Sequence, residues 1–220
     1  MTILYQDARI VVCLKPVGVL STDEPDGMPA RLRQVLGTDC IRTVHRLDAA
    51  VGGVMVFARS RAAAAILSQQ IREHSFKKEY LAAVHGCLDA ERGTLRDYLG
   101  YDRAARMAFS APAPSKEAKE AVLDYRLLER CDASSLLHIC LHTGRTHQIR
   151  AQLALRGHPL LGDRKYGGAD TDDASAPALW SYRVSFTHPQ SGERLTFSAP
   201  PPAALPWLQF SCIARIEREE

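Results

Sequence analysis

Short apolar runs closed by turn-forming residues predict strands in the first quarter of the chain. Residues 9–14, "RIVVCL", form a largely apolar run of the length of a buried strand. Pro16 and Gly18 follow it and favour a turn, because proline cannot continue a central strand and glycine permits a sharp bend. Residues 51–58, "VGGVMVFA", predict a second strand, whose paired glycines allow another backbone or a ligand to come close. The segment at 23–29, "DEPDGMP", predicts a loop between them.

The pattern then changes from strand-like to helical at residues 60–75, "SRAAAAILSQQIREHS". Ser60 is a typical helix N-cap, and the segment is rich in alanine. Ala63, Ile66, Leu67 and Ile71 recur at the spacing that places side chains on one face of a helix. This segment predicts an amphipathic helix packed on a sheet.

Strand-like patterns return in the second half of the chain. Residues 77–86 alternate and end at a glycine, whereas 87–120 are rich in prolines and charges and predict an exposed, loop-rich stretch. Two further strands are expected at 121–129 and 135–143, where apolar and polar side chains alternate.

A second helix and a hairpin complete the predicted elements. Residues 146–157 predict a helix with Thr146 as its N-cap and Gly157 just past its C-terminus. Residues 179–198 contain two alternating segments around the turn "HPQSGE" and predict a hairpin. Strands outnumber helices and are joined mostly by loops, which favours an α+β fold over a doubly wound parallel sheet.

Length and composition predict one globular domain over residues 1–220. An apolar fraction of 46% can supply a buried core. The 28 Lys and Arg residues against 25 Asp and Glu residues leave a formal charge of +3, which permits an anionic partner without requiring one.

Cysteine usage and the N-terminus predict a soluble cytoplasmic protein. The six cysteines include no C-x-x-C pair, and the first residues lack the basic and apolar regions of a signal peptide. No apolar run approaches the roughly 20 residues that span a bilayer. We therefore expect reduced thiols and no membrane association.

The spacing of the histidines does not predict a metal site. His138, Cys140 and His142 share one face of the predicted strand at 135–143, but His147 falls in the next helix. No H-E-x-x-H motif or cysteine pair supports zinc binding. The motifs of nucleotide hydrolases, dinucleotide-binding oxidoreductases and α/β-hydrolases are also missing, so no cofactor is expected.

Three polar segments beside apolar elements remain as candidates for chemistry. They are "HRLD" at 45–48, "KKEY" at 77–80 and "TGRTHQIR" at 143–150. Each by itself has an ordinary structural explanation, such as a surface ion pair or a packed tyrosine. Their combination favours a functional site.

The residues around these segments resemble the signatures of the RluA-like RNA pseudouridine synthases. "HRLDAAVGGVMVFAR" at 45–59 resembles the first signature, and "LHTGRTHQIRAQLALRGHPLLGDRKYGG" at 141–168 resembles the second almost throughout. The segments at 5–22 and 179–189 resemble the flanking elements in the family's order, so the likeness covers roughly residues 3–200. It implies the form of the family without an N-terminal S4 domain. It also implies a mixed, mainly antiparallel sheet core with flanking helices and loops, and a central active-site cleft.

The resemblance implies that the protein is an isomerase that converts uridine to pseudouridine in ribosomal or transfer RNA. Asp48 corresponds to the family's essential aspartate. A carboxylate can attack the sugar C1′ or the base C6, or take a proton, and later leave without a cofactor. The sequence leaves these three routes open.

The other catalytic residues also follow from the resemblance. Arg150 matches the arginine that pairs with the aspartate and would favour its ionised form. Tyr80 matches the tyrosine that lies against the target base and offers a stacking face and a phenol. Arg46 resembles the arginine that fills the space left by a flipped nucleotide, since the target base must leave the stack. His45 either contacts the RNA backbone or hydrogen-bonds within its own loop.

RNA would be held by basic and polar side chains in or beside the signatures. The proposed RNA-binding set is His45, Arg46, Lys78, Arg145, His147 and Lys165, with Arg42, Lys77 and Arg164 as further candidates for phosphate contacts. RNA is the expected partner, and a monomer is the default expectation for the assembly.

Two departures from the family pattern lie close to these residues. Val51, Gly52 and Gly53 stand where Thr-Ser-Gly is expected, and "LWS" at 179–181 stands where "LHA" is common. Both spare Asp48, and they put substrate contacts or loop shape in question more than the reaction type. The rival hypotheses are a noncatalytic RNA-binding or RNA-folding module on the same scaffold and a metal-dependent hydrolase that uses the histidines.

Overall fold

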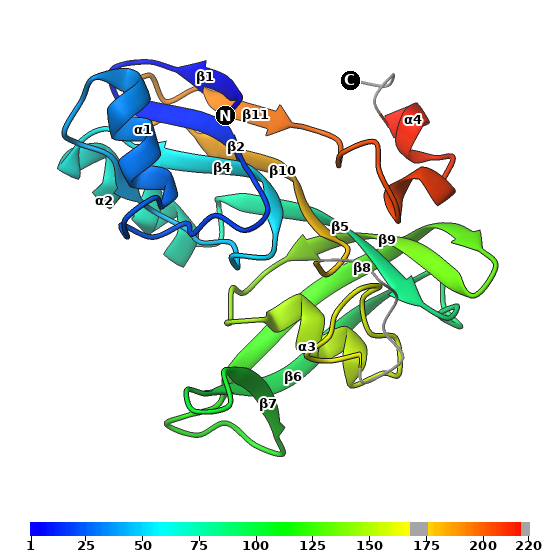
Figure 1. Ribbon diagram of the computed structural model, residues 1–220. Helices are drawn as coiled ribbons and strands as arrows, with labels where there is room; N and C mark the ends of the chain where they lie inside the picture. Colours follow the sequence, from blue (N-terminus) through cyan, green and yellow to red (C-terminus); the bar gives the residue numbers. More distant parts are fainter. Residues whose placement is uncertain (168–175, 217–220) are drawn as a thin grey trace. The chain divides into compact units, whose positions relative to one another are not determined.

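The computed structural model describes residues 1–167 and 176–216, so Gly168 at the end of the second signature lies outside the described residues. The chain forms two compact units (Figure 1). The first unit contains Met1–Lys78 and Trp180–Pro201, and the second contains Glu79–Leu179 and the residues from Pro202 onward. One domain can contain two such units, so the single catalytic domain stays a prediction.

The first unit is built on a mixed sheet. Its strands are β1 (Ile3–Gln6), β2 (Ile10–Lys15), β3 (Arg42–Thr43), β4 (Gly52–Ala58), β10 (Leu179–Thr187) and β11 (Arg194–Ser198). The order is β1-β2-β4-β10-β11, with β3 beside β4. The β4–β10 ladder is parallel, and the other ladders of this unit that the structure describes are antiparallel. All of β4 is buried, as its continuous apolar run predicts for a central strand. The predicted strands at 9–14 and 51–58 and the C-terminal hairpin are confirmed.

Two helices belong to the first unit, α1 (Met28–Leu36) and α2 (Arg61–Arg72). The prediction for α2 is confirmed, including its cap, because the Ser60 side chain accepts a hydrogen bond from the Ala63 backbone nitrogen at 3.1 Å. The helix packs its apolar face on the sheet, and the joint core is Ile10, Val12, Val54, Val56, Ala58, Ala63, Leu67, Phe76, Val184, Phe186 and Ala199.

Helix α1 is not predicted by the sequence pattern, and the predicted loop at 23–29 is wrong at its last two residues. Met28 and Pro29 form the first turn of α1. Proline is compatible with the first helical turn, because the backbone nitrogen there has no partner within the helix. The same residue type therefore signals either a loop or a helix start, and tertiary packing decides between them.

The second unit is built on an antiparallel sheet. Its strands are β5 (Lys77–His85), β6 (Arg92–Asp102), β7 (Met107–Ala111), β8 (Lys119–Cys131) and β9 (Ser134–Leu141). The order is β5-β9-β8-β6-β7. The predicted strands at 77–86, 121–129 and 135–143 are confirmed.

The loop-rich stretch predicted over 87–120 is wrong, because it contains β6, β7 and the start of β8. Strand β6 pairs with β8 from Arg92 to Leu99 and with β7 from Tyr98 to Asp102. Glycines and charged residues interrupt the alternation of apolar and polar residues in the sequence of β6. The backbone pairing with β8 supplies the order that local propensity lacks.

The helical elements of the second unit are α3 (Gln148–Ala154), a short 3-10 helix η1 (Trp207–Gln209) and α4 (Ile213–Ile216). The second predicted helix exists, but Thr146 is not its N-cap. His147 occupies that position in the left-handed conformation, with φ of 55°. The Gln148 side chain takes over the local hydrogen bonding, since its Oε1 accepts from the Arg145 backbone nitrogen at 3.0 Å.

The predicted α+β class with a mainly antiparallel sheet is confirmed by these elements. All six cysteines are free thiols, as expected. Among the described residues, no helix combines the length and the apolar character needed to cross a bilayer.

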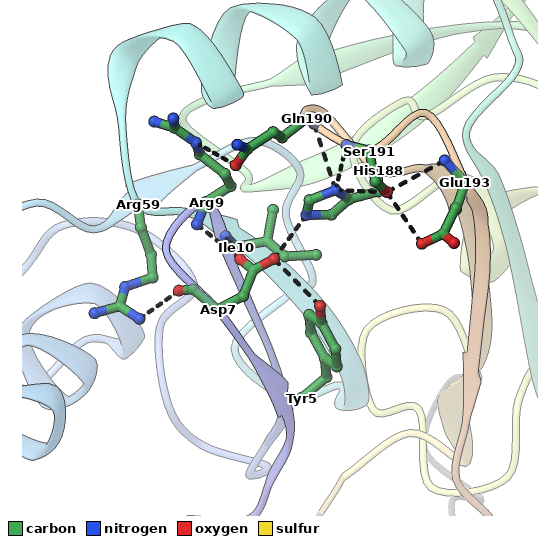
Figure 2. A network of polar contacts seen from close by, with 9 residues as sticks. All are labelled: Tyr5, Asp7, Arg9, Ile10, Arg59, His188, Gln190, Ser191 and Glu193. Carbon is green, nitrogen blue, oxygen red and sulfur yellow. Dashed lines mark hydrogen bonds and ion pairs between the residues drawn. The ribbon is translucent and has the colours of Figure 1, made fainter.

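A polar network ties the turn between β1 and β2 to the β10–β11 hairpin (Figure 2). The Asp7 Oδ1 atom accepts hydrogen bonds from the backbone nitrogens of Arg9 and Ile10 at 2.7 and 2.8 Å. Its Oδ2 atom accepts from the Tyr5 hydroxyl at 3.2 Å and lies 2.8 Å from His188 Nε2. Asp7 therefore caps the turn and pairs with the hairpin at once.

The hairpin side of this network holds the histidine ring in place. His188 Nδ1 accepts from the Ser191 backbone nitrogen at 3.0 Å, which leaves the Nε2 proton to face Asp7. A second link is the bond from Arg9 Nε to Gln190 Oε1 at 2.9 Å. Burial raises the pKa of Asp7, but the backbone bonds from Ile10 and Arg9 and the electrostatic effect of the His188 ring outweigh it and lower the pKa.

We expect Asp7→Ala to lower the free energy of unfolding by about 1–3 kcal/mol near neutral pH, because two backbone donors lose their acceptor. The folded pKa of Asp7 lies below the unfolded value, so its stabilisation is complete above about pH 4 and is lost as the pH falls through the folded pKa. Urea unfolding at several pH values should therefore show a gap between wild type and variant that narrows in acid. The exposed Glu24→Ala is the control. A gap that is unchanged between about pH 6 and pH 2 would contradict the assignment.

Candidate active site

Asp48 lies in the first unit, half-buried in the loop between β3 and β4, and backbone contacts hold this loop on both sides of it. Before it, the Leu47 backbone nitrogen donates to Ser21 Oγ at 3.0 Å, and the Ser21 hydroxyl donates back to the Leu47 carbonyl oxygen. After it, the Val51 backbone nitrogen donates to the Asp48 carbonyl oxygen at 3.0 Å. These bonds close the turn and hold its backbone on both sides of Asp48.

Lys15 supplies the centre of this arrangement, although sequence reasoning did not select it. Its side chain is fully buried, and its Nζ atom donates to the carbonyl oxygens of Pro16, Val19 and Ala49 at 2.9, 2.6 and 3.1 Å. Burial lowers the pKa of Lys15 to about 8, while the nearby Asp48 carboxylate acts in the opposite direction. The ammonium group thus joins the turn after β2 to the residue that follows Asp48.

The two departures from the family signature meet in space. Gly52 pairs with Trp180 and Gly53 with Ser181 across the parallel β4–β10 ladder. A Cβ atom on Gly52 would lie 2.4 Å from the Trp180 ring, and one on Gly53 would lie 2.3 Å from the Ser181 carbonyl oxygen. Gly53 also has φ of 123°, which side-chain-bearing residues rarely adopt. The Trp180 indole therefore fills the space that a serine at position 52 would need.

Tyr80 lies in β5 of the second unit and is 5% exposed. It pairs with the fully buried Ile139 of β9. The strand alternation of β5 therefore turns Tyr80 toward the apolar face of this sheet.

Arg150 lies in α3 of the second unit, and its buried guanidinium is held by Asp163. Nε and Nη2 donate to the two carboxylate oxygens of Asp163, each at 2.7 Å. Asp163 is fully buried, and Arg150 is 5% exposed. The Tyr166 ring lies against the guanidinium, with 5.1 Å between the ring centroid and Cζ. Sequence reasoning missed Asp163, although the "GDRKYGG" part of the second signature contains it.

Two glutamines fix the helix that carries Arg150. Gln148 Nε2 donates to the Val122 carbonyl oxygen at 3.1 Å and to Gln152 Oε1 at 3.0 Å. Gln152 in turn donates to Asp97 Oδ2 at 2.7 Å. Both side chains are buried, so they anchor the first turns of α3 to β6 and β8. These anchors fix the part of the helix from which the Arg150 side chain projects.

The predicted RNA-binding residues of the first unit differ in exposure. Arg46 is exposed and Lys78 is half-buried, and burial lowers the pKa of Lys78. His45 is buried, and its Nε2 accepts from the Val56 backbone nitrogen at 3.0 Å. Burial, with a smaller effect of Lys78, lowers the pKa of His45 to about 3, so the ring is neutral at physiological pH. This supports the hydrogen-bonding role for His45, and its RNA contact stays a prediction.

In the second unit, Arg145 and Lys165 are exposed and His147 is half-buried. Arg145 Nε donates to the Glu120 carbonyl oxygen at 2.8 Å, and Lys165 Nζ donates to the Arg106 carbonyl oxygen at 2.9 Å. His147 Nδ1 and the Tyr166 hydroxyl are 2.9 Å apart. The structure therefore gathers His147, Arg150 and Tyr166 into one contact group. Asp48 belongs to the other unit, so its pairing with Arg150 and the cleft stay predictions.

The histidines considered for a metal site do not come together. His142 Nε2 lies 2.6 Å from Asp124 Oδ2, and His147 contacts Tyr166. Only His138 and Cys140 of the original set are neighbours, and they meet a residue that sequence reasoning did not include, Glu79.

We expect Gly52→Ser to destabilise the protein by about 1–3 kcal/mol, because the new Cβ overlaps the Trp180 ring. Trp180→His should also destabilise, since it removes the bond from Trp180 Nε1 to the Ala199 carbonyl oxygen at 2.8 Å. The double variant should lose less unfolding free energy than the sum of the losses in the two single variants, with a coupling energy of roughly 0.5–3 kcal/mol. Urea unfolding of the four proteins measures this cycle. Additive losses would show that the two departures are unrelated.

We expect Asp163→Asn to cost about 3–5 kcal/mol of unfolding free energy, because it removes a fully buried carboxylate that accepts two charged hydrogen bonds from Arg150. Glu120→Gln is the matched control, because the Arg96–Glu120 pair is exposed and should change stability by less than about 1 kcal/mol. Chemical denaturation of both variants tests the contrast. Equal losses in the two variants would rule out a dominant role for the buried pair.

Comparisons with known proteins agree with the motifs described above. The sequence model for "RNA pseudouridylate synthase" matches residues 9–155. An uncharacterized RNA pseudouridine synthase of Bacillus subtilis, YhcT, is 36% identical over 213 residues, which cover 92% of this chain and 69% of the relative. Ribosomal large subunit pseudouridine synthase D of Neisseria meningitidis is 33% identical over 221 residues, which cover 92% of this chain and 58% of that protein.

Solved structures share the fold. Human RNA pseudouridylate synthase domain containing 1 superposes with a TM-score of 0.80 at 24% identity, covering 96% of this chain and 86% of that chain. Human RNA pseudouridylate synthase domain containing 4 gives a TM-score of 0.75 at 22% identity. The predicted pseudouridine synthase fold and the predicted isomerase function are confirmed. The chain belongs to the RNA pseudouridylate synthase family.

Proposed function

We propose that Asp48 is the nucleophile with which this RNA pseudouridine synthase isomerises uridine. The observation that carries the proposal is the closed turn around Asp48, whose neighbours Leu47 and Ala49 are tied by Ser21 and Lys15. A nucleophile needs a fixed position more than it needs a mobile side chain. In the reaction the N1–C1′ bond breaks and a C5–C1′ bond forms, while the proton leaves C5 and one is gained at N1.

The charges around Asp48 suit a carboxylate that acts as a nucleophile or base. The buried Lys15 ammonium attracts it, as the opposing effect of Asp48 on the Lys15 pKa indicates. Attack at C1′ or C6, or removal of a proton, all require the ionised form. The backbone hydrogen bonds of the loop hold the Asp48 peptide in place, and this limits the movement of the Asp48 side chain.

Arg150 and Tyr80 complete the proposed catalytic set. The planar Arg150 guanidinium is oriented by Asp163 and by the Tyr166 ring, so it offers a preformed cation to the aspartate or to the substrate. Tyr80 is the proposed stacking partner of the target base and the acceptor or donor of a proton during rearrangement. Both belong to elements whose positions are set by buried contacts.

Binding requires that the target nucleotide leave the stack, which costs a few kcal/mol that protein contacts must offset. The exposed Arg46, two residues before Asp48, is proposed to occupy the space that the base leaves. Arg145 and Lys165, with Lys78 and His147, are proposed to contact phosphates or sugars. His45 contributes to the loop by its bond to Val56 and is the weakest member of this set.

We further propose that the substrate is ribosomal RNA, with transfer RNA as the alternative. The supporting observation is the likeness to proteins named ribosomal large subunit pseudouridine synthase D. The six free cysteines fit a reducing compartment such as the cytoplasm. The monomeric state stays a prediction.

We expect Asp48→Asn to reduce pseudouridine formation by about 10⁴-fold or more, the scale on which removal of a nucleophile acts. The substitution keeps the shape of the side chain and should leave RNA affinity within a few-fold of wild type. The exposed Asp39→Asn is the control and should retain full activity. Mass spectrometry of transcripts of ribosomal and transfer RNA, incubated with each purified protein, measures the product.

The outcomes separate the hypotheses. Wild-type activity in Asp48→Asn would remove Asp48 from the chemistry. RNA binding by wild type without pseudouridine in any RNA, including total RNA from cells that lack the gene, would support the noncatalytic module. Product in transfer RNA alone would reject the ribosomal substrate and leave the reaction assignment intact.

A further inference from the structure

A cluster of three metal-ligating side chains lies on one face of the second unit's sheet. Glu79 of β5 stands directly opposite Cys140 of β9 in the antiparallel ladder. His138 lies two residues before Cys140, so its side chain points to the same face. Tyr80 follows Glu79 and therefore points to the other face, as its pairing with buried Ile139 indicates. The cluster thus lies on the opposite face of the sheet from Tyr80.

The atoms of this cluster lie near enough to share one ion. His138 Nε2 is 2.8 Å from Glu79 Oε2, and His138 Nδ1 is 4.0 Å from Cys140 Sγ. One ligand atom from each residue can be chosen so that all lie within 4.8 Å of one another. Nitrogen and sulfur ligands of one tetrahedral zinc ion are about 3.6 Å apart, from bond lengths of about 2.05 and 2.3 Å. Because Glu79 and Cys140 approach different ring nitrogens of His138, metal binding requires these side chains to rotate until one ring nitrogen and both partners face the same ion.

We propose that Glu79, His138 and Cys140 bind a divalent zinc-type cation. Thiolate and imidazole together select zinc over magnesium and calcium, which prefer oxygen ligands. Three protein ligands leave a position for water in tetrahedral coordination. All three side chains are half-buried, so an ion can enter from solvent while the sheet backbone holds the ligands. Binding releases the thiol proton of Cys140 and any proton on His138.

The site would act on structure and not on the chemical step. It would cross-link β5 to β9 at the position next to Tyr80 and so stabilise the strand that carries this residue. His142 is not a ligand, because it pairs with Asp124 on the neighbouring strand. The inference does not depend on the proposed function, since metal binding and strand stabilisation can be measured without RNA.

The test uses cobalt(II) as a spectroscopic probe and zinc(II) as its competitor. Metal-free full-length protein should bind one equivalent of cobalt(II) and show thiolate-to-cobalt charge-transfer and tetrahedral d–d absorption, both removed by one equivalent of zinc(II). Cys140→Ser should abolish the charge-transfer band. Its affinity should fall by more than the roughly 10- to 100-fold that loss of an outer-shell partner costs.

Two controls and a second variant make the result specific. Cys87→Ser removes an exposed thiol, and His142→Ala removes a histidine from the same strand region, so both should bind like wild type. Glu79→Gln should weaken binding while keeping the charge-transfer band, because the thiolate remains. Zinc(II) should raise the unfolding temperature of wild type and both controls but not of Cys140→Ser, whose folding is checked by circular dichroism. Absence of the band in wild type, or its persistence in Cys140→Ser, would overturn the proposal.

Discussion

A buried ammonium group is the constraint on which the loop of Asp48 depends. A lysine with no exposure to water needs acceptors inside the protein, since an unpaired buried charge is strongly unfavourable. Three backbone carbonyls meet this need, and they come from two separate stretches of chain. The requirement of Lys15 for acceptors therefore fixes the distance between the turn after β2 and the residue next to Asp48. The Ser21–Leu47 contacts add a second link between the same stretches.

The second unit uses the same principle with a different cation. The Arg150 guanidinium is buried, and the Asp163 carboxylate satisfies it through two parallel hydrogen bonds. The planar guanidinium allows few orientations for two parallel hydrogen bonds. The ion pair therefore fixes the direction of the Arg150 side chain and balances its charge. Gln148 and Gln152 bond helix α3 to the sheet, and Asp163 orients the Arg150 guanidinium. The loop of Asp48 and the helix that carries Arg150 thus each depend on a buried cation whose partners are supplied by the protein.

Packing also accounts for the departures from the family signature. Loss of the serine hydroxyl at position 52 looks like loss of a functional group when the sequence is considered alone. The structure relates it to the large indole of Trp180, which occupies the volume beside Gly52. The tryptophan in turn hydrogen-bonds to the Ala199 carbonyl oxygen, so it is an integrated part of the first unit. The steric fit between neighbouring strands relates Gly52 to Trp180 without any change in reaction type.

The sequence by itself determined the features that depend on local chemistry. These are the buried strands β2 and β4, helix α2 with its Ser60 cap, the α+β class and the ordered motifs that identify the family and its reaction. The sequence did not predict β6 and β7, because these strands are stabilised by pairing with partners that are distant along the chain. Strand β6 pairs with both β7 and β8. Tertiary structure alone decided that Lys15 reaches Ala49, 34 residues away, that Asp163 holds Arg150, and that Trp180 faces Gly52. The physical reason is that a side chain's need for a partner can be read from its type, whereas the identity of the partner depends on which backbone segments the fold brings within a few ångströms.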